Sequence, residues 1–182
     1  MARIPLWISI GLGAAGLACG PGENPAPDPT ADGSSFRDPF HYCQAVENID
    51  QPDSRWAGPQ VPPVIVAGMQ REALLGDVPQ RQIERGIFWR CMGGAVEVCF
   101  VGANIPCDQR ADTSRTPSAP MVDFCKSNPD SSYLPAFVTG RTTVYEWRCA
   151  GGEPQITKAV DEPDARGFPS AYWNSLRPPA KP

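Results

Sequence analysis

The chain has 182 residues, a formal net charge of −4 and no extended run of lysine or arginine. A mildly acidic protein without a basic cluster is a poor partner for nucleic acid, so we expect no nucleic-acid-binding function. Its 22 prolines favour loops and short elements over long helices. Its seven cysteines are typical of an exported protein held by disulfides.

The N-terminus has the pattern of an export signal. Arg3 is the only charged residue before Glu23, and residues 4–18 are apolar or small except for Ser9. This stretch is too short and too rich in glycine for a stable membrane span. We therefore predict a cleaved export signal over residues 1–18.

The predicted signal ends at Gly16-Leu17-Ala18-Cys19, which resembles the processing box of bacterial lipoproteins, with Gly16 where that box usually has leucine. The resemblance implies that Cys19 is lipidated, and Gly20 after it favours anchoring to the outer membrane, facing the periplasm. The rest of residues 19–35 is rich in Pro, Gly, Asp and Ser, which predicts a flexible tether. Without Cys19 an even number of cysteines remains, which suits disulfides. The alternative is simple secretion after cleavage near Ala18, giving a secreted or periplasmic protein.

One motif occurs twice, as Trp89-Arg90-Cys91-Met92-Gly93-Gly94 and as Trp147-Arg148-Cys149-Ala150-Gly151-Gly152. Upstream of each copy, a helix-like segment ends in an aromatic-cysteine pair, Tyr42-Cys43 or Phe124-Cys125. We predict one disulfide-stapled domain over 36–176, built from two related halves at 36–107 and 108–176. Each half is a short helix followed by an antiparallel hairpin, so the expected fold class is α+β, mainly β. Residues 177–182 are expected to fray.

In the first half, Asp38-Pro39 is typical of a helix start, and the apolar spacing predicts a helix over about 39–48. Residues 50–63 read as loop, and 62–66 are predicted to form a strand. Residues 70–85 are ambiguous, because Ala73-Leu74-Leu75 suggests a helix that Pro79 interrupts before it resumes over 80–85.

Two β-prone runs around Gly93-Gly94 predict a hairpin in which Met92 pairs with Ala95 and Cys91 pairs with Val96. In this register Cys99 lies opposite Phe88, on the other face from Cys91, which argues against a bridge between the two cysteines.

In the second half, Thr116 or Ser118 is expected to cap a short helix that ends before Pro129. Residues 133–139 are predicted to form a strand. Residues 142–149 and 154–160 are predicted to pair as a hairpin around Gly151-Gly152. The segment from Asp164 to Trp173 is expected to be strand or a short helical turn packed on the core.

If the halves share a fold, their corresponding cysteines pair as Cys43–Cys91 and Cys125–Cys149. Cys99 and Cys107 then close the loop between them. Six cysteines allow other pairings, so this set depends on the correspondence of the halves. A thiolate metal site on Cys91, Cys99 and Cys107 is disfavoured by the lack of a Cys-x-x-Cys pair, and we expect no metal or cofactor.

Several motifs together resemble a family of small exported bacterial proteins, with a match over roughly residues 36–176. They are the Trp-Arg-Cys-x-Gly-Gly motif, Val101-Gly102-Ala103-Asn104-Ile105-Pro106-Cys107, Ala111-Asp112-Thr113-Ser114-Arg115, Tyr145-Glu146-Trp147-Arg148-Cys149 and Asp164-Ala165-Arg166-Gly167. That family has no established activity, so the resemblance implies no catalytic or binding residue.

Candidate functional side chains are few. His41 is the only histidine, and no Gly-x-Ser-x-Gly motif marks a nucleophile for it. Trp89 and Trp147 share the face of the motif cysteines and are expected in the core, whereas Trp56 and Trp173 are better candidates for exposure. Glu97, Glu146 and Glu153 would serve glycoside hydrolysis only if two carboxylates faced each other in a cleft.

The polar loop around residues 107–116 is the best candidate for a binding surface. Its candidate binding residues are Asn104, Asp108, Arg110, Asp112 and Arg115. The loop lacks the Asp-x-Asp-x-Asp-Gly pattern of calcium sites. The alternative is an ordered loop whose side chains bond its own backbone.

From the sequence we expect a lipid-anchored envelope protein that binds an unknown protein or glycan partner and is not an enzyme. The alternative is a periplasmic hydrolase that uses acidic residues. A purely structural envelope component is the third hypothesis.

Overall fold

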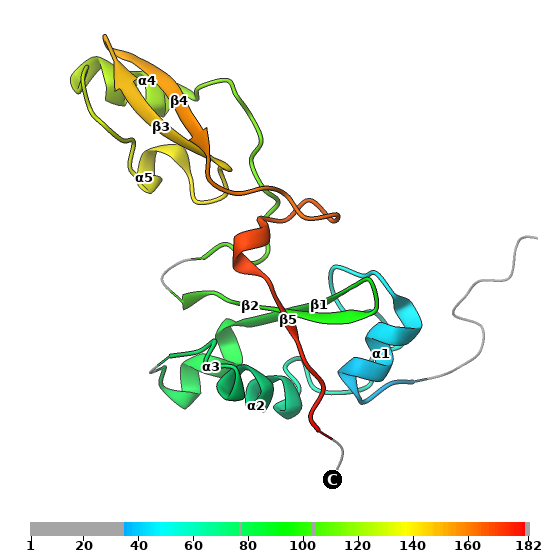
Figure 1. Cartoon of the computed structure of the whole chain (residues 1–182). Coiled ribbons are helices and arrows are strands. Elements are labelled where there is room, and N and C mark those ends of the chain that lie inside the picture. Colours follow the sequence, from blue (N-terminus) through cyan, green and yellow to red (C-terminus); the bar gives the residue numbers. More distant parts are fainter. Residues whose placement is uncertain (1–34, 77, 103–104, 181–182) are drawn as a thin grey trace, which may run out of the picture. The chain divides into compact units, whose positions relative to one another are not determined.

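A computed structural model describes residues 35–76, 78–102 and 105–180. The predicted export signal, Cys19, nearly all of the tether, Asn104 and residues 181–182 lie outside the described residues. The described part of the chain has an α+β fold, mainly β, with its strands in two antiparallel sheets (Figure 1). None of its helices is both long enough and apolar enough to cross a membrane.

The first sheet contains the predicted hairpin and one additional strand. β1 (Ile87–Met92) and β2 (Ala95–Phe100) pair with Met92 opposite Ala95, Cys91 opposite Val96 and Phe88 opposite Cys99, which confirms the predicted register. Gly93 and Gly94 both have positive φ, which only glycine adopts without steric cost. β5 (Asn174–Leu176) pairs with the other edge of β2, so the end of the chain completes the first sheet.

Helix α1 (Pro39–Val46) begins at the predicted residue. The Asp38 carboxylate accepts hydrogen bonds from the N–H groups of Phe40 and His41, at 2.9 Å each, and Pro39 occupies the first turn. Tyr42 and Cys43 point into the first hydrophobic core, which also contains Trp89, as predicted.

The predicted strand over 62–66 is wrong, because these residues begin helix α2 (Pro63–Arg71). Ile65, Val66 and Met69 are buried at helical spacing. Gly68 lets this helix approach β5 closely, since a Cβ there would lie 2.8 Å from Leu176 Cδ2. A short apolar run does not by itself distinguish a strand from a buried helix.

The ambiguous stretch that follows contains one helix. Residues 73–75 are not helical: the α2 helix ends at Arg71, and Ala73 has a φ of +57°. Helix α3 (Gln80–Gly86) forms where the pattern was expected to resume, directly after Pro79.

The second helix and hairpin also form as predicted. Helix α4 (Ala119–Ser127) follows Ser118 and ends before Pro129, although the Ser118 side chain makes no capping bond. β3 (Tyr145–Ala150) and β4 (Glu153–Ala159) pair around Gly151-Gly152. β3 begins at Tyr145, later than the predicted start at residue 142. The backbone of residues 142–144 instead makes hydrogen bonds to the backbone of Asp112.

The predicted strand over 133–139 is wrong. Leu134 makes one backbone bond to Trp147, and α5 (Ala136–Thr139) is a single helical turn. Pro135 explains the difference, because it has no N–H to donate to a ladder and its φ suits the start of a helical turn. The chain then reverses at Gly140, and after β4 it reaches the 3-10 turn η2 (Ser170–Tyr172) before β5.

Three disulfides join the predicted pairs: Cys43–Cys91, Cys99–Cys107 and Cys125–Cys149. Two of them tie a helix to the first strand of its hairpin. In both places a glycine of the hairpin turn donates its backbone N–H to a carbonyl just after the helix. Gly94 donates to Glu47, and Gly152 donates to Pro129. Trp147 packs in the second core, as predicted. That the halves are repeats of one unit remains a prediction.

Candidate functional site

Arg90, the arginine of the first motif, is completely buried on β1. Its Nη2 pairs with the carboxylate of Asp164, whose side chain is only 7% exposed. The arginine at the same place in the second motif, Arg148, is exposed and donates to Gln155 at 3.3 Å. The same motif position therefore has different roles in the two hairpins.

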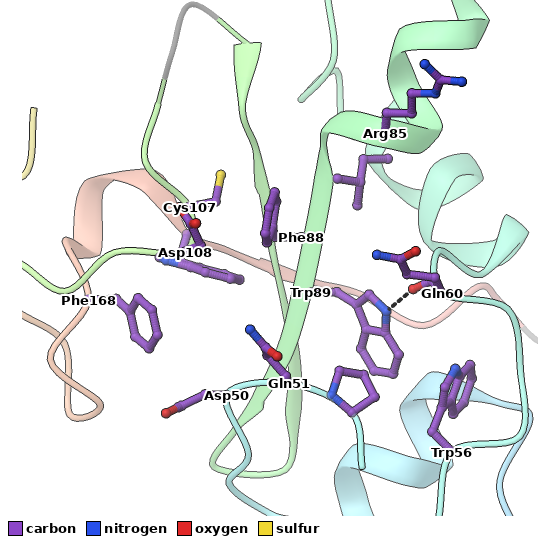
Figure 2. A pocket seen from close by; sticks show the side chains of 13 residues that line it. Asp50, Gln51, Trp56, Gln60, Arg85, Phe88, Trp89, Cys107, Asp108 and Phe168 are labelled. Carbon is purple, nitrogen blue, oxygen red and sulfur yellow. Dashed lines mark hydrogen bonds between the residues drawn. The ribbon is translucent and has the colours of Figure 1, made fainter. Parts of the chain in front are cut away.

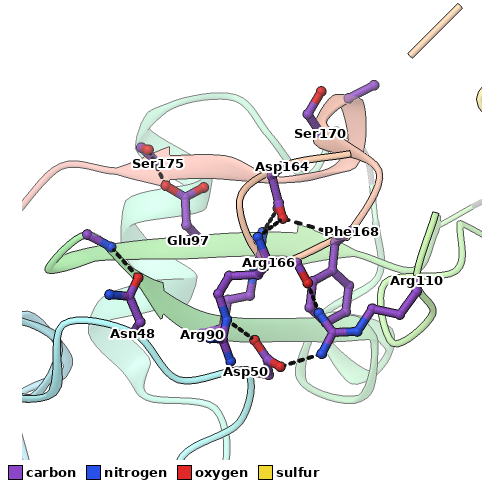
Figure 3. A network of polar contacts seen from close by, with 12 residues as sticks. Asn48, Asp50, Arg90, Glu97, Arg110, Asp164, Arg166, Phe168, Ser170 and Ser175 are labelled. Atoms are coloured by element: carbon purple, nitrogen blue, oxygen red, sulfur yellow. Dashed lines mark hydrogen bonds and ion pairs between the residues drawn. The ribbon is translucent and has the colours of Figure 1, made fainter. Parts of the chain in front are cut away.

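Aromatic rings surround the Arg90 guanidinium. Its central carbon lies 4.4 Å from the ring centroid of Phe168 and 4.1 Å from that of Trp173. The guanidinium of Arg110 also lies over Phe168, at 4.1 Å. A cation over an aromatic face is attracted by the ring quadrupole, most strongly when water is excluded. These side chains and their acidic partners form a single cluster, which we call the arginine cluster: Arg90, Arg110, Arg166, Asp50, Asp164, Phe168 and Trp173. Figure 3 labels all of them except Trp173.

Asp50 holds the exposed side of the arginine cluster. Its carboxylate accepts from Arg166 Nε at 2.8 Å and from Arg110 Nη2 at 2.5 Å. The hydrogen bond from Arg166, joined by the one from Arg110, lowers the pKa of Asp50 although partial burial opposes this. Asp50 is therefore ionised and fully engaged at neutral pH.

Asp164 organises the turn that carries Phe168. Its carboxylate accepts the backbone N–H groups of Arg166 at 2.8 Å and Phe168 at 3.1 Å. Burial acts to raise the pKa of Asp164, but the Arg90 bond and these two N–H groups outweigh it and lower the pKa. The Asp164-Ala165-Arg166-Gly167 motif is thus the structural turn that brings Phe168 to Arg90.

A hollow of about 560 Å³ shares Asp50, Phe168 and Trp173 with the arginine cluster. Residues 50–60, 85–89, 107–108 and 168–173 contribute to its lining. Its volume lies within the roughly 300–1,000 Å³ typical of small-molecule sites. Figure 2 shows that the labelled side chains around it come from segments far apart in the sequence.

Aromatic side chains make much of the wall. They are Trp56, Phe88, Trp89, Phe168 and Trp173. Trp56 Nε1 donates to the carbonyl of Pro59 at 3.0 Å, and Trp89 Nε1 donates to the carbonyl of Gln60 at 2.7 Å. The two indoles pack edge to face with centroids 5.0 Å apart. Trp89 is only 5% exposed and supports Trp56, whose partly buried ring presents carbon surface to a ligand.

The polar side chains of the wall are mostly unpaired. Within the described part of the chain, the side chains of Gln51, Gln60, Arg85 and Asp108 have no hydrogen-bond or ion-pair partner, and all four residues are exposed. Two amides, one guanidinium and one carboxylate supply both donors and acceptors, and their charges cancel. Such a set can bond a ligand without first breaking contacts within the protein.

The loop residues predicted as a binding surface have separate roles. Asp108 lines the hollow and Arg110 belongs to the arginine cluster. The Asp112 carboxylate accepts the N–H of Ser114 at 2.8 Å, and Arg115 lies over the ring of Tyr145 at 5.1 Å. Asn104 lies outside the described residues. For Asp112 the alternative of an ordered, self-bonded loop fits the contacts better.

Sequence reasoning missed most of the hollow. Trp56 and Trp173, expected to be exposed, are partly buried and line it. Gln51, Gln60, Arg85 and Phe88 belong to no motif, so no sequence signal identified them. The only indication was that the duplicated motif assigned Trp89 and Trp147 to the core but made no such prediction for Trp56 and Trp173.

The catalytic alternatives gain no support from these contacts. Glu97 is buried and accepts from the Ser175 hydroxyl, while Glu146 pairs with Lys158 at 3.3 Å. His41 is exposed on α1. Among the described residues, no group of three or more His, Cys, Asp or Glu side chains is placed to hold a metal ion.

The fold and the hollow together define a disulfide-stapled α+β protein with an aromatic-walled pocket. Comparisons with protein-family models, curated proteins and solved structures found no match for the chain. The resemblance to small exported bacterial proteins stays a prediction, so the function is argued from the residues of the hollow.

Proposed function

We propose that the protein is an exported, non-enzymatic binding module of the bacterial envelope, whose protein or glycan partner enters the hollow between Trp56 and Trp173. The observation that carries this proposal is the combination of aromatic carbon surface with unpaired polar side chains in one pocket. Binding sites are commonly apolar hollows with a few polar groups that orient the ligand. The Cys43–Cys91 and Cys99–Cys107 disulfides and the arginine cluster stabilise the segments that form the walls, which lowers the entropy lost on binding.

Hydrolysis by acidic residues is less well supported. Among the described residues, the carboxylates that line the hollow are those of Asp50 and Asp108. Asp50 is bonded by two arginines, and its lowered pKa does not suit a general acid, which needs a proton near neutral pH. A single remaining carboxylate, Asp108, does not make the pair that glycoside hydrolysis requires.

The disulfides and the predicted signal support the proposed place of action, the cell envelope. Three disulfides are typical of proteins in an oxidising compartment. We further propose that Cys19 is lipidated and anchors the chain to the outer membrane. The intact mass of the protein from its own host tests this: we expect the added mass of lipid on Cys19, and a gain of about six daltons on reduction of three disulfides. A secreted chain that begins after residue 18 without lipid would contradict the anchor.

Ligand binding is tested with the mature, ¹⁵N-labelled protein and envelope extract from the host, separated into protein and glycan fractions. We expect one fraction to shift the indole N–H signals of Trp56, Trp89 or Trp173. Gln51→Trp should fill the hollow and abolish the shift, whereas Gln109→Trp, at an exposed glutamine outside the lining, should retain it. If no fraction shifts these signals, or if both variants respond like wild type, the hollow is not the binding site.

A further inference from the structure

The chemistry of the hollow also discriminates between classes of ligand. We infer that it binds a neutral sugar ring, as part of an oligosaccharide; this inference rests on the proposed binding function. A pyranose ring has C–H groups on its faces and hydroxyls around its edge. A matching site therefore needs aromatic faces together with polar side chains that both donate and accept hydrogen bonds.

The aromatic requirement is met by the partly buried indole of Trp56, which packs against the buried indole of Trp89, and by the half-buried ring of Phe88. The Nε1–H of Trp56 donates to a backbone carbonyl at 3.0 Å, and its ring packs edge to face on Trp89, which fixes the Trp56 ring and leaves its exposed carbon atoms for the ligand. Burying C–H groups against such rings is favourable because it removes apolar surface from water.

The polar requirement is met by the side chains of Gln51, Gln60, Arg85 and Asp108. An amide both donates and accepts, the guanidinium of Arg85 donates, and the carboxylate of Asp108 accepts. A hydroxyl group also does both, so this mixture suits a polyol. None of the four side chains has a partner within the described chain, so each is available to a hydroxyl.

Charge argues against ionic ligands. Among the described residues of the lining, a phosphate ligand would find one cation, Arg85, and two carboxylates, Asp50 and Asp108. A cationic ligand would find Asp50 already neutralised by Arg110 and Arg166. The described lining thus carries little net charge, so it favours an uncharged ligand whose hydroxyls exchange water for hydrogen bonds to the protein.

An extended peptide is the competing class of ligand. Peptides that add to a sheet need a free strand edge. Next to the hollow, the edge of β1 at Cys91 is already paired with Ile49, through two backbone hydrogen bonds of 3.0 Å. A proline-rich peptide can still dock on aromatic rings alone, so it serves as the comparison ligand.

The experiment titrates the mature protein with the trisaccharides of N-acetylglucosamine, of β-1,4-linked glucose and of α-1,4-linked glucose, and separately with a proline-rich decapeptide. Indole N–H shifts report occupancy of the hollow, and calorimetry gives Kd. We expect at least one trisaccharide to bind, with a Kd that stays within about twofold between roughly 0.05 and 0.5 M salt, because no ion pair forms.

Matched variants test whether the trisaccharide binds in the hollow. Gln51→Ala and Asp108→Asn should each weaken trisaccharide binding by about tenfold, the effect of losing one or two hydrogen bonds. Phe88→Ala should weaken it through lost ring contact. The exposed controls Gln109→Ala and Asp130→Asn, outside the lining, should bind like wild type. Near-ultraviolet circular dichroism checks that each variant is folded.

The outcomes separate the two proposals. If the decapeptide or a host protein fraction shifts the hollow's indoles while no trisaccharide does, the sugar inference is overturned and the binding module stands. If no trisaccharide, peptide or envelope fraction shifts them, both fall. Trisaccharide binding that the control variants weaken as much as the hollow variants do would also overturn the sugar site.

Discussion

The guanidinium carbon of Arg90 lies 4.4 Å from the ring centroid of Phe168, and this contact joins the first hairpin to the segment that precedes β5. The same guanidinium pairs with Asp164, whose turn presents Phe168. Arg90 Nε and Nη1 are buried and have no acceptor among the described residues. The rings of Phe168 and Trp173 therefore balance part of its charge. Because Phe168 and Trp173 also line the hollow, the arginine cluster holds one of its walls.

Replacing Arg90 should be far more damaging than replacing its counterpart in the second motif. Arg90→Ala leaves the Asp164 carboxylate buried and unpaired, so we expect a loss of about 3–5 kcal/mol in the free energy of unfolding. Arg148→Ala, at an exposed site, should change it by about 0.5 kcal/mol or less. Urea unfolding measures both. Equal losses of unfolding free energy in the two variants would contradict a larger contribution of the buried arginine cluster to stability.

The stability of the protein should fall in acid. Folding lowers the pKa of Asp50 through its arginine bonds, and that of Asp164 through Arg90 and two backbone N–H groups although burial opposes it. A lowered pKa stabilises the folded state above the unfolded pKa of about 3.9, and this is lost as pH falls through the folded value. We therefore expect a level free energy of unfolding from about pH 7 to 5 and a decline below about pH 4.

Urea midpoints measured across this range test the assignment. Asp164→Asn should lower stability at neutral pH and flatten the acid decline, because it removes one of the groups that must be protonated. Asp130→Asn, at an exposed site, should leave the profile unchanged. A decline of unchanged steepness in Asp164→Asn would assign the acid sensitivity to other carboxylates, such as Asp53, whose pKa Arg55 lowers through a hydrogen bond.

The three disulfides should differ in their contribution. Their sequence separations are 48 for Cys43–Cys91, 24 for Cys125–Cys149 and 8 for Cys99–Cys107. The entropy of loop closure predicts losses of about 4, 3.5 and 2.5 kcal/mol when each pair is replaced by alanine. Chemical unfolding of the three double variants gives the order. If removing Cys99–Cys107 costs most, its local role in positioning Cys107 and Asp108 at the hollow outweighs loop entropy.

Gly58 should be intolerant of a side chain because of Trp56. A Cβ at this position would lie 2.3 Å from Trp56 Cζ2, so Gly58→Ala must displace the indole. We expect a loss of about 1–3 kcal/mol, typical of overpacking, together with a shifted indole N–H signal for Trp56. Ala57→Ser, at the exposed neighbour, is the control and should leave both unchanged. An unshifted Trp56 signal in Gly58→Ala would mean that the backbone, and not the ring, gives way.

Local signals predicted the local elements well, and their failures have clear causes. The Asp38-Pro39 start of α1 and the Gly93-Gly94 hairpin depend on backbone chemistry within a few residues, so the sequence is sufficient for them. Instead of the strand predicted over 62–66 the structure has the start of α2, and instead of the strand over 133–139 it has a single helical turn, α5, at Ala136–Thr139. Both are short apolar stretches next to proline, where periodicity is too brief to decide and the surrounding fold determines the element.

The duplicated motif in the sequence predicted the pairing of the cysteines, on the condition that the two halves correspond, and the three disulfides of the structure match that prediction. The sequence also determined the mildly acidic net charge of the chain. Only the tertiary structure decided that β5 joins the first sheet, that Arg90 is buried while Arg148 is exposed, and that Trp56, Phe88, Gln60 and Asp108 line one hollow. The reason is physical: hydrogen bonds within turns and helices act over a few residues, whereas burial and a shared pocket depend on segments far apart in the chain that meet only when the whole domain packs.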